Sequence, residues 1–561
     1  MPAASIYSGF VQKQPKLENQ YHCDAILKRV LKRYIPDAEL YARAEPLWIN
    51  MGDKTISDNY FRWLSDAEKH PPTIRSLDSF GNPVPIKDCI VTSEGWRHLK
   101  DECFSEGIVA IGYDRDEWGH YARVVQFGVY YLFSPSSAIT TCPFAMTDGC
   151  ARVLEVYHPQ GRNHPVFKRL TSRDPKIGYT SGQWMTERSG GSDVSGTETF
   201  ATKTTATRGG EPEYSVSGFK WFSSATESQV TLLLAREAEG AKLNCYLGYV
   251  HEGGVRVSRL KEKLGTKALP TAELELNGLK ATKVSKDGRG VATIASVLNI
   301  TRAHNCISST SFAARSFTIA KEFTKLRKVF GKPLTENPAH LKILAAIAVK
   351  LRAMTHLAFF TISLLGKSEA GTSTEAEQVL LRLICPLAKA YIAKNCLAIV
   401  SECAEGMGGV GYLENDQEIN IARLLRDSQV LTIWEGTTNV LSDDFVRLVK
   451  GKSAQTLPAI NALVTESLAK DTHGWDQVLQ AEMRELTQTV EQSSLEVLRA
   501  QGRSIMFAFA RTICSALMIA DSASDQDATA VECSRRWIAG DEGLVTGIES
   551  KAKMDYKIVF G

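Results

Sequence analysis

The sequence lacks the residue patterns that hold a structural metal or a disulfide framework. Its 12 cysteines include no CxxC pair, and its 11 histidines form no HExxH motif. Structural zinc sites depend on such closely spaced ligands, and disulfide scaffolds on regularly paired cysteines. We therefore predict no metal site, and thiols that are mostly buried and reduced.

Phosphate-binding glycine motifs and strong charge are also absent. No GxxxxGK[ST] segment occurs, and no GxGxxG segment opens a strand–turn–helix unit, which argues against a P-loop or a Rossmann nucleotide site. The net charge of +3 over 561 residues gives no whole-chain reason to bind nucleic acid or an anionic membrane. The hydrophobic content of 43% is that of an ordinary globular protein.

Long uncharged apolar runs are missing too. The most apolar long segment, Leu341 to Leu365, contains three basic residues, so we expect a core helix and no membrane span. Neither a secretory signal, a clear transit peptide nor a Ser-Lys-Leu type of C-terminus is visible. We expect an intracellular protein, cytoplasmic or mitochondrial, without a clear targeting signal.

Hydrophobic periodicity divides the sequence into zones. Residues 1–180 are mixed and mostly helical, whereas residues 181–290 contain short segments of period two such as "YSVSGFKWF" and "AELELNGL". The helical period returns in residues 291–450 and continues through residues 451–561. This segregation predicts an α+β fold, with an N-terminal helical domain, a middle antiparallel β domain, a helical bundle and a helical C-terminal extension.

One carboxylate stands alone in an apolar stretch. Glu435 is the only charged residue in "LTIWEGTTNVL", and the run contains no cation to pair with it. Burial of an unpaired carboxylate raises its pKa, which is the property that a general base near neutral pH requires. A solvated or helix-capping glutamate beside an exposed Trp434 fits this short stretch equally well.

Three other segments combine turn glycines, hydroxyls, aromatic rings and basic residues. They are "WMTERSGGSDVSGTET", "GFKWFSSAT" and "LRKVFGKPL", and a glycine-rich turn, "GMGGVG", precedes the Glu435 stretch. Glycines of this kind let the backbone approach a ligand, and their exposed N–H groups suit phosphate or carbonyl oxygens. A surface turn or core packing explains each segment taken singly, but the order of all four is specific.

In this order the segments resemble the acyl-CoA dehydrogenase superfamily, and "MTERSGGSDV", "KWFSSA" and "IWEGTTN" are most similar to its AidB-like (alkylation-response) branch. The resemblance covers roughly Tyr179 to Leu448, and the N-terminal region by position. It implies a flavoprotein that binds FAD, with a four-helix C-terminal domain and the extra helical domain of the AidB-like branch. It also implies an acyl-CoA substrate and a homotetramer arranged as a dimer of dimers.

The resemblance assigns cofactor contacts by position. The residues before position 230 match those at the flavin ring and the pyrophosphate, with Phe222 where many relatives have Trp. The matching residues between 327 and 409 are implied to contact the FAD of a neighbouring subunit. The positions implied to bind FAD are Thr186, Ser192, Phe222, Ser224, Arg327, Phe330, Gly408, Gly409 and Thr437.

The resemblance makes Glu435 the catalytic base of a FAD-dependent acyl-CoA dehydrogenase. It would remove the proton α to a thioester while hydride passes from the β carbon to flavin N5. Some relatives carry the base just before an arginine on an earlier helix, but Thr301 precedes Arg302 here and cannot serve. Ser192 and Arg302 are the expected substrate contacts. Two alternatives remain: an acyl-CoA oxidase, and an AidB-like FAD-binding protein with little turnover that binds DNA or acyl chains.

The C-terminal extension, residues 451–561, shows two amphipathic stripes that predict packing helices. Its charge weighs against a DNA-binding role, because it holds 11 Lys and Arg against 15 Asp and Glu. A patch around Arg535, Arg536 and Arg503 would give nonspecific, salt-dependent binding at best. The resemblance does not identify the electron acceptor of the flavin.

Overall fold

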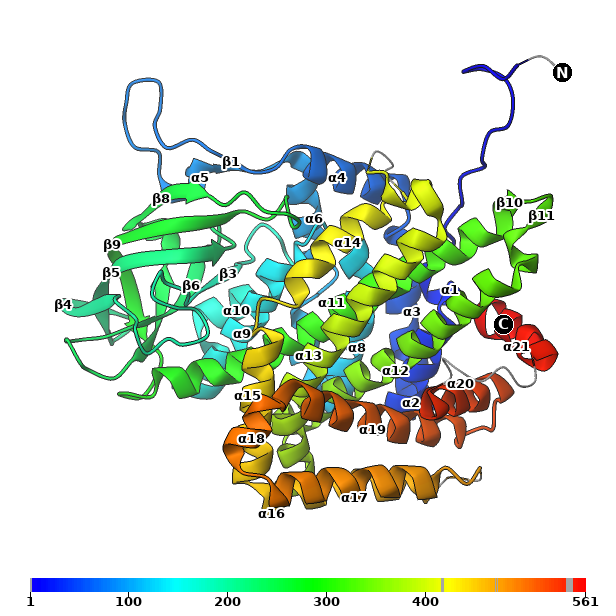
Figure 1. Ribbon diagram of the computed structural model, residues 1–561. Helices are drawn as coiled ribbons and strands as arrows, with labels where there is room; N and C mark the ends of the chain where they lie inside the picture. Colours follow the sequence, from blue (N-terminus) through cyan, green and yellow to red (C-terminus); the bar gives the residue numbers. More distant parts are fainter. Residues whose placement is uncertain (1–2, 415–417, 470, 472, 541–547) are drawn as a thin grey trace.

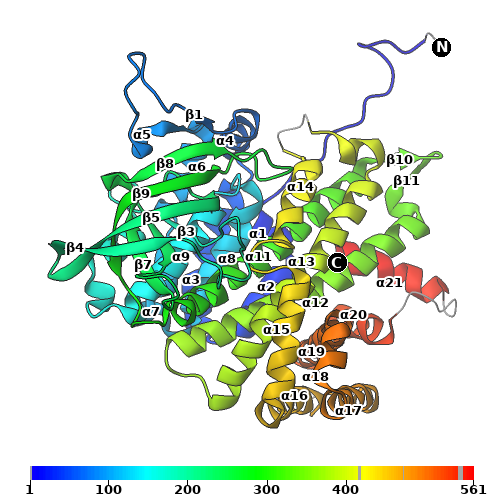
Figure 2. The ribbon, with the colours of Figure 1, turned by 60° about the vertical axis from the view of Figure 1, so that its left-hand side comes forward.

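Helices and sheet occupy separate parts of the molecule, as the two hydrophobic periods predict (Figure 1). The computed structural model describes residues 3–414, 418–469, 471, 473–540 and 548–561. The sheet lies at one side of a large helical body, and the helices of the extension cover another side of that body (Figures 1 and 2). The predicted α+β fold class is confirmed.

The N-terminal region is helical. Asp24, Asp37 and Ser93 cap three of its helices by accepting backbone N–H groups, which fixes where those helices begin. The elements are α1 (Gln20–Cys23), α2 (Ala25–Tyr34), α3 (Ala38–Lys54), α4 (Asp58–Lys69), β1 (Thr73–Ile74), α5 (Ile86–Cys89), β2 (Ile90–Val91), α6 (Glu94–Ser105), α7 (Arg115–Trp118), α8 (Ala122–Phe133), α9 (Thr141–Tyr157) and α10 (Pro165–Leu170).

The middle region forms a seven-stranded sheet in the order β3-β6-β7-β9-β5-β4, with β8 paired to β9. All these pairs are antiparallel except β3–β6, which is parallel. The β domain has an apolar core of its own, which includes Trp184, Tyr214 and Tyr246. The strands are β3 (Ser181–Trp184), β4 (Phe200–Arg208), β5 (Glu211–Ser224), β6 (Val230–Ala235), β7 (Asn244–Tyr249), β8 (Val255–Leu260) and β9 (Thr271–Lys283).

Long helices form the bundle. Thr374 and Glu377 make a reciprocal capping box at the start of α13, and Asn337 caps α12 ahead of Pro338. A hairpin joins α11 to α12 and lies at the end of the molecule far from the sheet in both views (Figures 1 and 2). The elements are α11 (Gly290–Leu326), β10 (Lys328–Val329), β11 (Lys332–Pro333), α12 (Pro338–Glu369), α13 (Glu375–Gly406), α14 (Ile421–Leu431) and α15 (Thr438–Gly451).

A buried ion-pair network joins the N-terminal helices to the bundle. Arg123 of α8 lies 2.8 Å from Asp148 of α9 and 2.6 Å from Glu369 of α12, and all three side chains are almost fully buried. His304 of α11 contacts the same Asp148 carboxylate at 2.8 Å. Because removing one partner would leave a buried charge uncompensated, this network fixes the helices relative to one another.

The C-terminal extension packs on the body through the predicted stripes. Leu479, Met483 and Val490 of α17, and Ile505 and Phe509 of α19, are buried. The helices are α16 (Ser453–Leu468), α17 (Asp476–Gln492), α18 (Leu495–Ala500), α19 (Gly502–Ser522), α20 (Ala528–Ala539) and α21 (Ile548–Phe560).

The basic patch suggested for the extension is only partly a surface. Arg536 is buried and pairs with Glu532 and Asp555, and Arg535 also pairs with Glu532. Arg503 donates to the Asn439 side chain at 2.8 Å. The expected patch was therefore wrong for Arg536, because packing buries this residue and Glu532 of α20 and Asp555 of α21 pair with it.

Among the residues that the structure describes, three helices, α12, α13 and α19, are long and apolar enough to cross a membrane by length and composition. In each, 78% of the most apolar window is buried inside the protein. Their apolar character thus accompanies packing within the helical body, and the expected absence of a membrane span stays a prediction.

Candidate functional site

Glu435 lies in the turn between α14 and α15, where side chains from α11 and α13 converge on it. The Thr301 hydroxyl donates to Glu435 Oε2 at 2.5 Å, and Arg302 Nε donates to the Glu435 carbonyl oxygen at 3.3 Å. Lys389 Nζ donates to the carbonyl oxygen of Gly436 at 2.7 Å. Glu435 has a left-handed backbone, with φ of +58°, which a non-glycine residue adopts only when its surroundings hold it there.

Burial raises the pKa of the Glu435 carboxyl above its ordinary value. The hydrogen bond from Thr301 and the charges of Arg302 and Lys389 act in the opposite direction and favour the ionised form. Glu435 has no cation beside it in its own sequence run, but the fold brings Arg302 of α11 and Lys389 of α13 near it. The balance gives a half-buried acid whose pKa is raised toward the range of a general base.

Thr301 stands at the position that carries the base in some relatives, and it contacts Glu435 directly. Thr301 is buried on α11, and its hydroxyl meets the carboxylate that comes from the α14–α15 turn, 134 residues away. The two alternative base positions of the resemblance thus converge on one place in this structure. Arg302 turns toward the Glu435 backbone, and its contact with substrate stays a prediction.

Polar contacts join the end of β5 to Lys263. The Ser224 hydroxyl lies 3.0 Å from the Thr271 hydroxyl, which accepts from Lys263 Nζ at 3.1 Å. Burial lowers the pKa of Lys263 to about 8. Burial also raises the pKa of the Cys142 thiol, which lies close enough to Lys263 and Glu435 to feel both charges. No local sequence pattern identified Lys263, Thr271 or Cys142 as candidate site residues.

The glycine-rich loop after β3 is anchored by an ion pair. Glu187 Oε1 lies 2.6 Å from Lys220 Nζ of β5 and accepts from the Thr199 hydroxyl at 2.6 Å, and all three residues are buried. The Lys220 ammonium and these hydrogen bonds outweigh burial and lower the pKa of Glu187. The pair thus holds the loop of residues 187–196 against β5.

The predicted ligand hydroxyls and ring of the β domain border solvent. Thr186 is half-buried, Ser192 is exposed in the loop, and the Phe222 ring is 50% exposed. The Lys261 ammonium lies 4.4 Å from the centre of that ring. Thr437 is exposed at the N-terminus of α15, where its side chain makes no capping bond. These groups are accessible to a ligand.

The remaining predicted cofactor residues lie at the far end of the bundle. Arg327 ends α11, and Phe330 is fully exposed at the tip of the β10–β11 hairpin, with φ of +50°. Gly408 and Gly409 are exposed, and a Cβ atom at either would meet no other atom within 4 Å. His340 links the two places, because it hydrogen-bonds Thr324 of α11 at 2.8 Å and lies against Gly406.

The structure therefore sorts the predicted residues into two groups. Glu435 and the predicted substrate contact Arg302 meet at one place, together with Thr301. The hairpin with Arg327 and Phe330 lies at the opposite end from the sheet in both views (Figures 1 and 2). One chain does not bring the two groups together.

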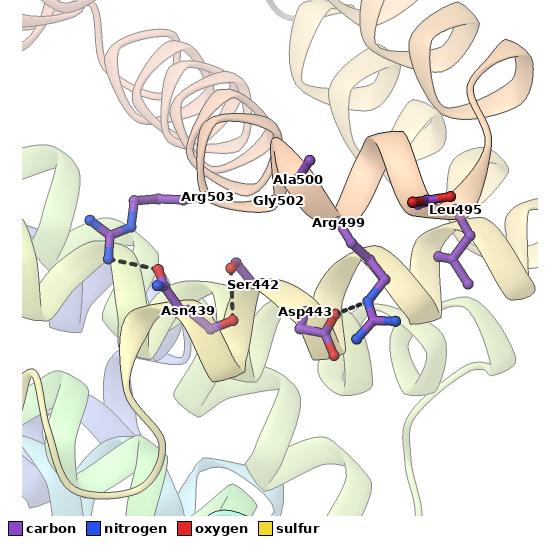
Figure 3. A pocket seen from close by; sticks show the side chains of 9 residues that line it. Asn439, Ser442, Asp443, Leu495, Arg499, Ala500, Gly502 and Arg503 are labelled. Carbon is purple, nitrogen blue, oxygen red and sulfur yellow. Dashed lines mark hydrogen bonds and ion pairs between the residues drawn. The ribbon is translucent and has the colours of Figure 1, made fainter.

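A separate open groove of about 870 Å³ lies between α15 and α18–α19 (Figure 3). Arg499 donates to Asp443 at 2.5 Å across it, and Arg503 donates to Asn439. Its lining carries two acidic and two basic side chains and none of the predicted site residues. Within the described ranges, no group of three His, Cys, Asp or Glu residues could hold a metal ion.

A helical domain, a sheet and a helical bundle in this order, with a half-buried glutamate after α14, define the acyl-CoA dehydrogenase fold. Three families match in the same order: the adaptive response protein AidB N-terminal domain at residues 12–174, the acyl-CoA dehydrogenase middle domain at residues 182–279, and the acyl-CoA dehydrogenase C-terminal domain at residues 288–449.

Individual proteins extend the match over most of the chain. Acyl-CoA dehydrogenase family member 11 of Caenorhabditis elegans is 38% identical over 547 residues, which are 92% of this chain and 86% of the relative. AidB of Escherichia coli is 27% identical over 466 residues, 81% of each chain. The chain belongs to the acyl-CoA dehydrogenase family, and the predicted AidB-like resemblance is confirmed.

Solved structures agree with this assignment. Caenorhabditis elegans ACDH-11 in complex with C11-CoA has a TM-score of 0.87 and 34% identity, and the match covers 100% of this chain and 98% of that one. An acyl-CoA dehydrogenase from Bacillus anthracis complexed with FAD shares the fold, with a TM-score of 0.68 and 15% identity over 98% of this chain and 93% of that one.

Proposed function

We propose that this protein is a FAD-dependent acyl-CoA dehydrogenase in which Glu435 removes the proton from the carbon α to the thioester. The observation that carries the proposal is the half-buried Glu435 carboxylate, whose pKa is raised by desolvation and whose Oε2 accepts from Thr301. Family membership supports the reaction class. The C11-CoA complex of the 34%-identical C. elegans structure supports an acyl-CoA as substrate.

The residues present fit FAD. The half-exposed ring of Phe222 and the hydroxyl of Ser224, two residues further on, lie at the end of β5 and offer a ring face and a hydrogen bond to a ligand. The Ser223 side chain between them is buried on the opposite face of the strand. Thr186, Ser192 and Thr437 would complete the set. Bound FAD supplies the acceptor for the hydride that leaves the β carbon.

The protein's own part of the reaction is to hold and accept a proton. Because Oε2 is committed to Thr301, and Oε1 has no hydrogen-bond partner among the described residues, Oε1 is the atom that takes the α proton. Burial raises the basicity of the carboxylate, and exclusion of water strengthens hydrogen bonds to the thioester carbonyl as negative charge develops there. Ser192 and Arg302 are the proposed substrate contacts.

We further propose that the active form is a homotetramer, a dimer of dimers. Arg327, Phe330, Gly408 and Gly409 lie apart from Glu435 in one chain, which supports their use in the cofactor site of a neighbouring subunit. A fully exposed Phe330 at a hairpin tip is costly in water, and contact with a second subunit would bury it.

The test is an anaerobic titration of the flavin-loaded protein with acyl-CoAs of different chain length and branching, followed by flavin absorbance. We expect bleaching by at least one acyl-CoA. Hydrogen peroxide produced under air by the same acyl-CoA would identify an oxidase instead. Flavin that stays oxidised with every acyl-CoA would contradict the proposal and favour an AidB-like flavin-binding protein with little turnover.

A further inference from the structure

Lys389 is a buried cation that the proposed reaction has not yet used. It lies in the middle of α13, and its side chain has no exposed surface. Its Nζ donates to the Gly436 carbonyl oxygen at 2.7 Å. Among the residues that the structure describes, no carboxylate oxygen approaches Nζ within ion-pair distance. An ammonium group in such a place carries a large desolvation cost, so a nearby negative charge must help to keep it protonated.

That negative charge is the Glu435 carboxylate. Burial lowers the pKa of Lys389 to about 8, and the charge of Glu435 acts against this effect. In return, the charge of Lys389 favours the ionised form of Glu435. The other charged or titratable groups near the pair are Arg302 and Cys306 of α11, Cys385 and Lys394 of α13, and Cys142 of α9.

Two cations also hold the backbone of the turn. Arg302 from α11 donates to the Glu435 carbonyl oxygen, and Lys389 from α13 donates to that of Gly436. These two successive carbonyl groups directly follow the Cα of Glu435, whose left-handed backbone a non-glycine residue adopts only when its surroundings hold it there. The two helices therefore fix where the carboxylate points.

We infer that Lys389 is the positioning residue of Glu435: its ammonium group fixes the turn through Gly436, and its charge keeps the carboxylate ionised and able to accept a proton. This inference rests on the proposed function, because it presumes that Glu435 is the base. Arg302 is half-buried and carries a permanent charge, whereas Lys389 is fully buried, so the field of Lys389 is screened least by solvent.

The test separates the charge of Lys389 from its hydrogen bond. Lys389→Gln keeps a donor for the Gly436 carbonyl but removes the charge, Lys389→Arg keeps the charge, and Lys394→Gln removes an exposed charge from the same helix as a matched control. For each variant, the rate of flavin reduction by acyl-CoA is measured anaerobically against pH, together with FAD content.

We expect the acidic limb of the Lys389→Gln profile to move upward by about one pH unit, the lower range for loss of an opposite charge near a carboxylate. Flavin reduction should then be about tenfold slower on that limb and recover at higher pH. The limb should stay in place in Lys389→Arg and Lys394→Gln. A uniform loss of rate at every pH in Lys389→Gln, without a displaced limb, would overturn the inference and leave Lys389 a purely structural role.

The Glu435→Gln variant separates the role of Lys389 from the identity of the base. If Glu435→Gln abolishes flavin reduction and the Lys389→Gln limb does not move, only the role of Lys389 is wrong. If Glu435→Gln reduces flavin at the wild-type rate, the proposed base is wrong, and the inference fails with it.

Discussion

Replacing Asp521 with Asn should loosen the C-terminal extension from the body. Asp521 of α19 is 2% exposed, and Arg29 Nε of α2 donates to its two carboxylate oxygens at 2.8 and 2.7 Å. Arg352 and His356 of α12 lie 3.4 and 3.3 Å from the same carboxylate. Breaking a buried pair by removing one partner costs about 3–5 kcal/mol. We expect the lower end, about 3 kcal/mol, because Asp525 still pairs with Arg29 at 2.7 Å.

The control is Asp525→Asn, which removes the same charge from the same arginine at a site where the carboxylate is 51% exposed. This change should cost less than about 1 kcal/mol. Hydrogen exchange of the α19 amides reports the free energy of local opening, and 3 kcal/mol corresponds to exchange roughly 100-fold faster. Exchange in Asp521→Asn within about threefold of the control would refute the reasoning.

The same carboxylate gives a pH dependence with a defined sign. Burial raises the pKa of Asp521, but His356 and the always-charged Arg29 outweigh it and hold the pKa well below its ordinary value. The stabilisation is therefore complete at neutral pH and is lost as the pH falls through the lowered folded-state value. Burial also lowers the pKa of His356, so stability declines as the pH falls below about 6.5, where the unfolded chain binds this proton first.

Two further predictions concern assembly and partners. Arg327→Ala should lose FAD and the native oligomeric mass together, because a cofactor that binds the assembled state stabilises it; a variant with stoichiometric FAD and native mass would contradict the cross-subunit site. Duplex DNA should bind weakly and lose affinity steeply with salt, because Arg536 is buried and Arg535 is paired. Binding that survives physiological salt and disappears in Arg535→Ala/Arg536→Ala would restore a DNA-associated role.

Local pattern predicted the elements of this fold well. The period-two segments became β4, β5, β8 and β9, because alternation records which side of a strand is buried. The parallel pairing of β3 with β6 was not predicted, because it joins segments about 50 residues apart and no local pattern encodes it.

The candidate site likewise combines a residue that a local pattern identified with residues that only the fold brings to it. The lone carboxylate of Glu435 could be read from its own apolar run, since the signal is local. Thr301 and Lys389, which hold it, come from helices 134 and 46 residues away in sequence. In the same way, Arg29 and Asp521 meet across 492 residues. Long-range partners of this kind depend on how the helices pack, and the sequence pattern of one segment does not contain them.

The most direct test of the account is single-turnover flavin reduction by Glu435→Gln. Gln conserves the side-chain volume and can still accept from Thr301, so fold and FAD content should be unchanged. Loss of the general base should slow flavin reduction by about 10²–10⁴-fold, or roughly 3–5 kcal/mol of transition-state stabilisation. Reduction at the wild-type rate by the same acyl-CoA would place the base elsewhere and contradict the central claim.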